Sequence, residues 1–231
     1  MTNEIIPYLE MCTRETVSLQ QGMNYRLGGT YSFIIMSVRP NAPYRDEVLD
    51  DGQTLIYEGH DMPRSRLGAD PKSQDQPEFT PTGQRTQNGK FHLAAQQAKV
   101  GQRLPELVRV YEKIRAGIWS NNGLFHLVDS WREFDGTRDV FKFKLVVADE
   151  DAGTPADGAR KAETEPSRLI PTSVKLEVWK RDGGRCVMCG ATDELHFDHI
   201  IPFSRGGTSL RAENIQLLCA RHNLEKRDRI Q

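Results

Sequence analysis

Strand-like patterns dominate the first 148 residues of the chain. Short apolar runs rich in β-branched and aromatic residues, bounded by turn residues, are typical of β-strands; they cover residues 30–38, 53–59, 123–134 and 139–148. Helical periodicity predicts two short helices, at residues 89–101 and 175–183. Because strands and helices do not alternate regularly, we expect an α+β protein with a curved or barrel-like, mostly β domain at residues 1–148.

The pattern breaks between residues 149 and 171. This segment is rich in Ala, Gly, Pro and charged residues and contains no aromatic residue. Such a composition buries too little apolar surface to offset the entropy of ordering the chain. We therefore predict a flexible linker at residues 149–171, followed by a small C-terminal domain at residues 172–231.

Composition and charge change this picture little. A chain of 231 residues is long enough for two domains, and a net charge of −1 does not by itself indicate a nucleic-acid partner. No apolar run approaches the roughly 18 residues of a membrane helix, and the N-terminus lacks the basic-then-apolar order of a signal peptide. We expect a cytoplasmic protein without a membrane partner.

Three of the four cysteines have metal-ligand spacing. Cys186 and Cys189 form a C-V-M-C pair, and Cys219 and His222 follow about thirty residues later. Two short ligand pairs at such a separation are typical of a closed tetrahedral zinc site. Because four protein ligands leave no position for water, we expect a structural Zn²⁺. We interpret the remaining Cys12 as a small buried apolar residue.

The segment between the ligand pairs is chemically unusual. In LHFDHIIPFSRGG, residues 195–207, the side chains of His196, Asp198 and His199 interrupt an otherwise apolar, strand-like run. Such groups are costly to bury unless a proton, a metal or a phosphate occupies them. With the flanking CVMCG, the stretch LHFDHIIPFSRGGTSLRAENIQLLCARHNLEK resembles the HNH endonuclease motif, a ββα-metal fold, in its zinc-containing form. The resemblance implies a metal-dependent DNA endonuclease that hydrolyses phosphodiester bonds.

The same resemblance implies a role for each matching residue. His199 matches the general base, and imidazole suits proton abstraction near neutral pH. Asp198 and Asn223 match the ligands of one catalytic cation, Mg²⁺ or Mn²⁺. Asn214 matches the central catalytic Asn, which braces the loop that carries the base. Lys226, one helical turn after Asn223, is expected to contact phosphate.

The position of these groups in a strand sets a geometrical condition. In an ideal strand, the neighbours Asp198 and His199 would point to opposite faces. Both reach one phosphate only if the strand ends or bends there, and Pro202 with the following S-R-G-G supplies such a bend. His196 shares the face of Asp198, and both a supporting and a purely structural role stay open for it.

A second resemblance concerns the N-terminal domain. The stretch YRDEVLDDGQTLIYEGHDMP, residues 44–63, resembles the SRA (YDG) family, which reads modified cytosine in DNA by flipping the base into a pocket. TQNGKFHLAA, residues 86–95, and GLFHLVDSWREFDGTRDVFKFKLVV, residues 123–147, extend the resemblance. It implies that Tyr44 and Tyr57 form stacking walls and that Asp46 accepts a hydrogen bond from the exocyclic amine. Glu47 is the alternative acceptor, because the Tyr44–Tyr57 interval leaves the register open.

Together the two resemblances predict a modification-dependent, type IV-like restriction endonuclease. Its partner would be double-stranded DNA that contains 5-methylcytosine or a related 5-substituted cytosine, which is cut nearby. One HNH centre hydrolyses one strand, so we expect a homodimer. Two alternatives stay open: an HNH endonuclease that reads unmodified sequence, and a reader of modified DNA whose nuclease is inactive. A zinc-ribbon interaction module would leave the Asp198–His199 pair unexplained.

Overall fold

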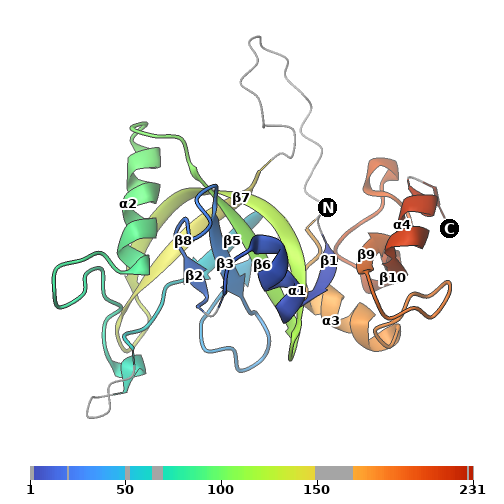
Figure 1. The fold of residues 1–231 in the computed structure, drawn as a ribbon, viewed down its shortest axis with the longest axis horizontal. Coiled ribbons are helices and arrows are strands. Elements are labelled where there is room, and N and C mark those ends of the chain that lie inside the picture. The colour runs from blue at the N-terminus through green and yellow to red at the C-terminus, as the bar shows by residue number, and fades with distance from the viewer. Residues whose placement is uncertain are drawn as a thin grey trace, which may run out of the picture.

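The chain forms one extended mixed sheet with helices packed at its sides and end (Figure 1). The structure is a computed structural model that describes residues 3–19, 21–49, 53–63, 70–148, 169–227 and 229–230. Its elements, in chain order, are β1 (Glu4–Pro7), α1 (Tyr8–Glu15), β2 (Met23–Asn24), β3 (Ser32–Met36), β4 (Glu47–Val48), β5 (Thr54–Glu58), α2 (Gln87–Lys99), β6 (Glu106–Arg115), β7 (Ile118–Phe134), β8 (Asp139–Val147), α3 (Thr172–Arg181), β9 (Leu195–His199), β10 (Ile215–Cys219) and α4 (Ala220–Lys226).

The long strands β6, β7 and β8 form the centre of the sheet. The strand order runs β10-β9-β1-β7-β6-β3-β2. On a second branch, β8 pairs with β7 and with β5, and β5 pairs with β4. All pairs are antiparallel except β3 with β6. Register shifts interrupt the pairing of β7 with both β6 and β8, and such bulges bend a sheet. The strongly curved β7 in Figure 1 agrees with the expected curved, mostly β N-terminal domain.

Helix α2 closes one side of the N-terminal core. The side chain of Thr86 caps its start by accepting a hydrogen bond from Gly89 N at 3.2 Å. Phe91 and two alanines of the helix pack against Phe141 and Phe143 of β8. A Cβ atom on Gly89 would lie 2.3 Å from the carbonyl oxygen of Glu78, so this close approach requires glycine. The helix confirms the prediction for residues 89–101.

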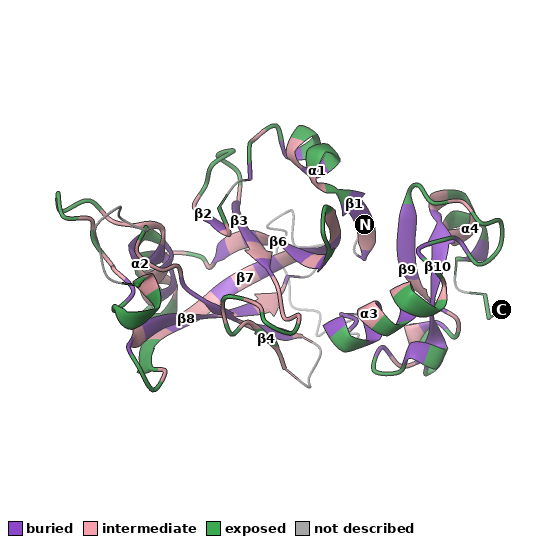
Figure 2. Cartoon of the chain, turned by 90° about the horizontal axis from the view of Figure 1, so that it is seen from below, coloured by how far each residue is buried: buried purple, intermediate pink, exposed green. Residues whose placement is uncertain are grey.

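The C-terminal domain has a ββα arrangement. Strands β9 and β10 form an antiparallel hairpin that is buried along nearly its whole length (Figure 2). Helices α3 and α4 pack against it, and α3 confirms the helix predicted at residues 175–183. The α+β class is confirmed for both parts of the chain.

Five elements of the N-terminal part were not predicted from the sequence: β1, α1, β2, β4 and β6. Of these, β1 pairs with β7 on one side and β9 on the other. Most of the predicted linker, residues 149–168, lies outside the described residues. Its described end does not have the exposed character expected of a linker, because Leu169 and Ile170 are buried. Across the described ranges, no helix combines the length and apolar character that crossing a membrane requires.

Candidate functional site

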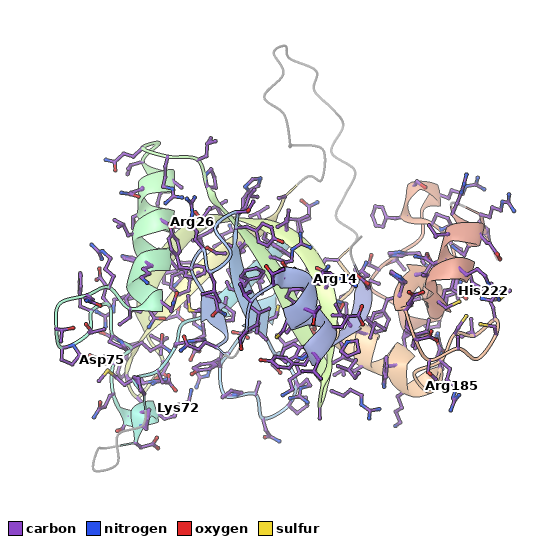
Figure 3. All side chains as sticks on the ribbon, in the orientation of Figure 1. Arg14, Arg26, Lys72, Asp75, Arg185 and His222 are labelled. Carbon is purple, nitrogen blue, oxygen red and sulfur yellow. The ribbon has the colours of Figure 1, made fainter. Side chains whose placement is uncertain are left out.

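Three cysteines and a histidine meet in the C-terminal domain. Cys186 and Cys189 lie in the turn before β9, Cys219 ends β10, and His222 lies on α4. The ligand atoms of all four lie within 4.8 Å of one another. Figure 3 shows His222 with sulfur atoms beside it, on the side of this domain that faces away from the N-terminal domain. The structure thus brings together the four residues predicted as zinc ligands.

The spacing of these atoms fits a tetrahedral zinc ion. The sulfur atoms of Cys189 and Cys219 lie 3.9 Å apart, and Zn–S bonds of about 2.3 Å in a tetrahedron imply roughly 3.8 Å. His222 Nδ1 lies 3.3 Å from Cys186 Sγ and 3.4 Å from Cys219 Sγ. The cluster can therefore bind zinc in a closed, structural site.

The surroundings of Cys186 favour its thiolate. Burial disfavours the charged form, but hydrogen bonds from the backbone of Cys219, Met188 and Cys189 and from the His222 ring lower the pKa of Cys186 to about 6. Thiolate is the form that binds metal. The site therefore holds its first ligand in the metal-binding form at neutral pH.

The last two residues of β9 reach one small cavity. Asp198 and His199 line a space of about 60 Å³ with Pro202 and Lys226 among their neighbours. Strand β9 ends at His199, and the chain turns at Pro202. Because the strand ends there, the neighbours Asp198 and His199 both line this cavity and do not point to opposite faces of a strand. This is the bend that the sequence predicts after His199.

The His199 ring is held by two neighbours. Its Nε2 lies 2.8 Å from the hydroxyl oxygen of Ser209, and both residues are buried. The ring of Phe203 meets it edge to face, with centroids 6.4 Å apart. Ser209 was not predicted as a site residue, because a serine in a polar loop carries no spacing signal. Its contact fixes the orientation of the imidazole.

Lys226 contacts the site's own residues. Its ammonium nitrogen lies 2.9 Å from Asp198 Oδ2 and donates to the backbone oxygen of His199 at 2.6 Å. The side chain is only 1 % exposed. In this arrangement the lysine ties α4 to the end of β9 and offsets the charge of Asp198. Its expected contact with phosphate stays a prediction.

Asn214 braces the loop that follows β9. Its side chain accepts a hydrogen bond from Ile201 N at 2.8 Å and donates to the carbonyl oxygens of Ile201 and Thr208 at 3.1 and 3.0 Å. A Cβ atom on Gly207 would lie 1.8 Å from the carbonyl oxygen of Ile201. The loop is therefore packed so closely that glycine is required at this position.

Two residues lie near this cavity without lining it. Asn223 is half-buried on α4, and within the described part of the chain it is not among the lining residues; its role as a cation ligand stays a prediction. His196 is 3 % exposed and pairs across the sheet with Glu4 and Leu218. Burial lowers the pKa of His196. These surroundings favour its structural interpretation.

A second cavity, of about 540 Å³, opens in the N-terminal domain. Tyr44, Asp46 and Tyr57, the residues predicted to read a base, all line it, together with aliphatic and basic side chains. Glu47, the alternative carboxylate, is exposed on β4 and is not one of the described residues that line the cavity. The structure therefore brings Asp46, rather than Glu47, to the two tyrosines.

Two backbone groups hold the carboxyl of Asp46. Oδ2 accepts from Ser37 N at 3.0 Å, and Oδ1 accepts from Glu58 N at 3.1 Å. Burial raises the pKa of Asp46 to about 7, although these two hydrogen bonds act in the opposite direction. A fixed carboxyl that titrates near neutral pH in a cavity is typical of a binding group.

His60 belongs to the same cavity and was not predicted. Its ring stacks on Tyr44 with centroids 5.6 Å apart, and its Nε2 lies 3.1 Å from the hydroxyl of Tyr57. Asn88 fixes its backbone through two hydrogen bonds of 2.8 Å, while Gly22 approaches the ring closely. Burial lowers the pKa of His60 to about 4, so the ring is neutral at pH 7. His60 therefore contacts both tyrosines of this cavity.

The comparisons with known proteins concern both parts of the chain. No curated protein matches its sequence. A solved structure of SUVH5 SRA with hemi-methylated CG DNA is 24% identical, with 69% of this chain and 93% of that chain covered and a TM-score of 0.44. Another, Arabidopsis thaliana SUVH6 in complex with SAM, is 20% identical, with 75% and 28% covered and a TM-score of 0.40. The family model described as HNH endonuclease matches residues 186–229. The C-terminal segment at residues 186–229 is therefore similar to HNH endonucleases.

Proposed function

We propose that the chain is a modification-dependent, type IV-like DNA restriction endonuclease. The N-terminal cavity takes a 5-methylcytosine, or a related 5-substituted cytosine, flipped out of double-stranded DNA. The HNH segment then hydrolyses a phosphodiester bond nearby. The observation that supports base reading is the cavity itself, which is lined by two tyrosines, a histidine and an oriented carboxyl. The cutting step rests on the family match at residues 186–229.

The chemistry of the cavity suits an extruded cytosine. Extruding a base costs a few kcal/mol, and stacking on aromatic rings stabilises the extruded base by about 1–3 kcal/mol. Tyr44 and Tyr57 offer such rings. The oriented oxygens of Asp46 suit the exocyclic amine, which is a hydrogen-bond donor. The neutral ring of His60 adds a further polar contact within reach of the same base.

The nuclease centre combines fixed residues with a cation. Asp198 and Asn223 would hold a Mg²⁺ or Mn²⁺ ion, which would supply charge to stabilise the scissile phosphate and the leaving oxygen. Carboxylate and amide oxygens are the ligands that these cations prefer. Lys226 contacts one oxygen of Asp198 and offsets part of its charge.

His199 takes the proton of the attacking water in this proposal. The hydroxyl of Ser209 holds one ring nitrogen, so the imidazole does not rotate freely when a phosphate binds beside it. Asn214 holds the loop after the strand, which keeps the cavity in shape. Since one such centre cuts one strand, double-strand cleavage requires two copies, and we propose a homodimer on DNA.

Digestion of matched plasmids tests this function. Plasmids that carry cytosine, 5-methylcytosine or 5-hydroxymethylcytosine are incubated with the zinc-loaded protein and Mg²⁺ or Mn²⁺, with His199→Ala protein as the control for contaminating nuclease. We expect cleavage of a modified plasmid and none of the unmodified one. Equal cleavage of all three would instead identify an endonuclease that reads unmodified sequence, and no cleavage would identify a reader with an inactive nuclease.

A further inference from the structure

The two domains share a hydrophobic core. One buried cluster combines apolar side chains from strands of the N-terminal domain with those of the C-terminal hairpin and α3; it includes Ile5, Ile114, Val174, Val178, Phe197 and Leu217. Ile5 lies on β1 and Ile114 on β6. Pulling the domains apart would expose apolar surface on both sides, which is unfavourable in water. The contact is therefore part of the folded core.

Strand β1 joins the two domains by backbone hydrogen bonds. It pairs with β7 along its whole length and with β9 at Glu4 opposite His196. Next to it, Asn3 N donates to Asn121 O at 2.7 Å, and Phe197 N donates to Asn3 O at 3.0 Å. Figure 1 shows β1 between the curved sheet and the hairpin. The sheet of the N-terminal domain therefore continues into the C-terminal domain.

A buried ion pair crosses the same boundary. Lys175 Nζ on α3 lies 2.8 Å from Glu112 Oε2 on β6, and neither side chain is exposed. Asn122 of β7 completes the network, because its Oδ1 accepts from Lys175 at 2.6 Å and its Nδ2 donates to Glu112 at 2.9 Å. The hydroxyl of Thr172 also donates to Glu112. Removing one charge would leave its partner buried and unpaired, which is strongly unfavourable.

We infer that these contacts, and not the segment at residues 149–168, set the position of the nuclease centre relative to the base-reading cavity. Cleavage then falls at a fixed distance from the modified base. Lys175 and Glu112 are positioning residues, since they act through the arrangement of the domains. The prediction about cleavage rests on the proposed function, whereas the fixed arrangement of the domains does not.

Nicking the chain tests the arrangement without any substitution in the interface. A recognition sequence for a specific protease is inserted between residues 149 and 168 of the full zinc-loaded chain, and the protein is then cut there. We expect both fragments to elute together in size-exclusion chromatography. We also expect nicked protein to cut a duplex with a single 5-methylcytosine at the same nucleotide as intact protein. Separate elution of the fragments would overturn the inference.

A matched pair of lysine variants tests the ion pair. Lys175→Met leaves Glu112 without its cation, so in the nicked protein we expect fragment association to weaken about 10²- to 10³-fold. In the intact chain we expect cleavage to spread over several positions. Lys180→Met is the control, because Lys180 is exposed on the same helix, and it should change neither result. Unchanged association and cleavage in folded, zinc-loaded Lys175→Met would contradict the inference.

A double variant separates the role of the pair from a folding defect. Glu112→Leu combined with Lys175→Met removes both buried charges together, and such replacements are often tolerated. We expect fragment association and the single cut position to recover relative to Lys175→Met alone.

A Gly-Ser insertion in the segment at residues 149–168 completes the test. We expect the cut position to stay the same, and a shift with the length of the insertion would overturn the inference. Fragments that stay together in a protein that cuts no modified DNA would refute the proposed function and leave the fixed arrangement intact.

Discussion

At the scale of single residues, the N-terminal cavity holds two groups whose pKa values are shifted in opposite directions. Asp46 is raised to about 7 and His60 is lowered to about 4, in both cases mainly by burial. Burial favours the neutral form of each group. Burial in the cavity therefore disfavours the charged form of both side chains.

These shifts predict opposing effects of pH on stability. Between about pH 4 and 7, Asp46 is ionised in the unfolded chain but keeps its proton in the folded protein. The contribution of Asp46 to the free energy of unfolding therefore falls as the pH rises, by at most about 4 kcal/mol. His60 has the opposite sign, because the unfolded ring binds a proton as pH falls from about 6.5 to 4. Asp46→Asn should therefore make stability rise more steeply with pH than in the wild type, and His60→Gln should make it rise less. Urea titrations at several pH values measure both slopes, and parallel wild-type and variant curves would contradict the assignment.

In the proposed function, His199 is the residue on which hydrolysis depends most directly. His199→Ala should lower the rate of DNA cleavage by about 10² to 10⁴ and leave binding of modified DNA unchanged, because the reading cavity lies in the other domain. Single-turnover cleavage and a binding assay on the same duplex measure the two effects. A wild-type rate in purified His199→Ala protein would show that another group is the base.

At the scale of elements, the sequence predicts what is local and misses what depends on distant partners. The zinc ligands lie in two short pairs whose spacing locates them, and Asp198–His199 lie in a short stretch that resembles the HNH motif. Strand β6 was missed because charged residues interrupt its apolar pattern: Glu106 and Glu112 are buried there. Glu106 pairs with the nearby Arg103 and with Arg26, and Glu112 pairs with Lys175; Arg26 and Lys175 are remote in the sequence. Pairing of this kind is invisible before the chain is folded.

The loop after β9 makes a prediction at this scale. Gly207→Ala places a methyl group against the carbonyl oxygen of Ile201, so the loop must shift and release the side chain of Asn214. We expect a loss of stability of about 1–3 kcal/mol and a loss of cleavage. Gly28→Ala is a suitable control, because a Cβ there would meet its nearest atoms only at 4.0 Å. Equal melting temperatures for the two variants would contradict the close packing of this loop.

At the scale of the whole molecule, the zinc cluster and the reading domain belong to one connected fold. The core that contains Cys186 and Cys219 also contains Ile5 and Ile114 of the N-terminal domain. Removing zinc with a chelator should therefore lower the melting temperature of the whole protein, since metal binding and folding are coupled in such modules. Near-UV circular dichroism of a variant in which Trp131 and Trp179 are replaced by Phe, so that Trp119 of the N-terminal domain is the one tryptophan left, follows this change. An unchanged Trp119 signal after complete zinc removal would show that the domains unfold independently.

The curved, mostly β fold and the HNH-like C-terminal segment were predictable from sequence, but the connection between them was not. The composition of residues 149–171 favours a flexible linker between independent domains. The buried Leu169 and Ile170, the pairing of β1 and the Lys175–Glu112 pair all arise from contacts between remote segments. No local pattern in those segments predicts that they meet.

The most direct test of the account is a binding measurement with duplexes that differ by a single 5-methyl group. His199→Ala protein is used at fixed salt so that the DNA stays intact, and Tyr57→Ala in the same background removes one stacking face. We predict tighter binding of the methylated duplex, and a loss of roughly five- to 150-fold in its affinity on Tyr57→Ala. Non-specific binding, which phosphate contacts carry, should change far less. Equal affinity of the His199→Ala protein for both duplexes would contradict the claim that this cavity reads modified cytosine.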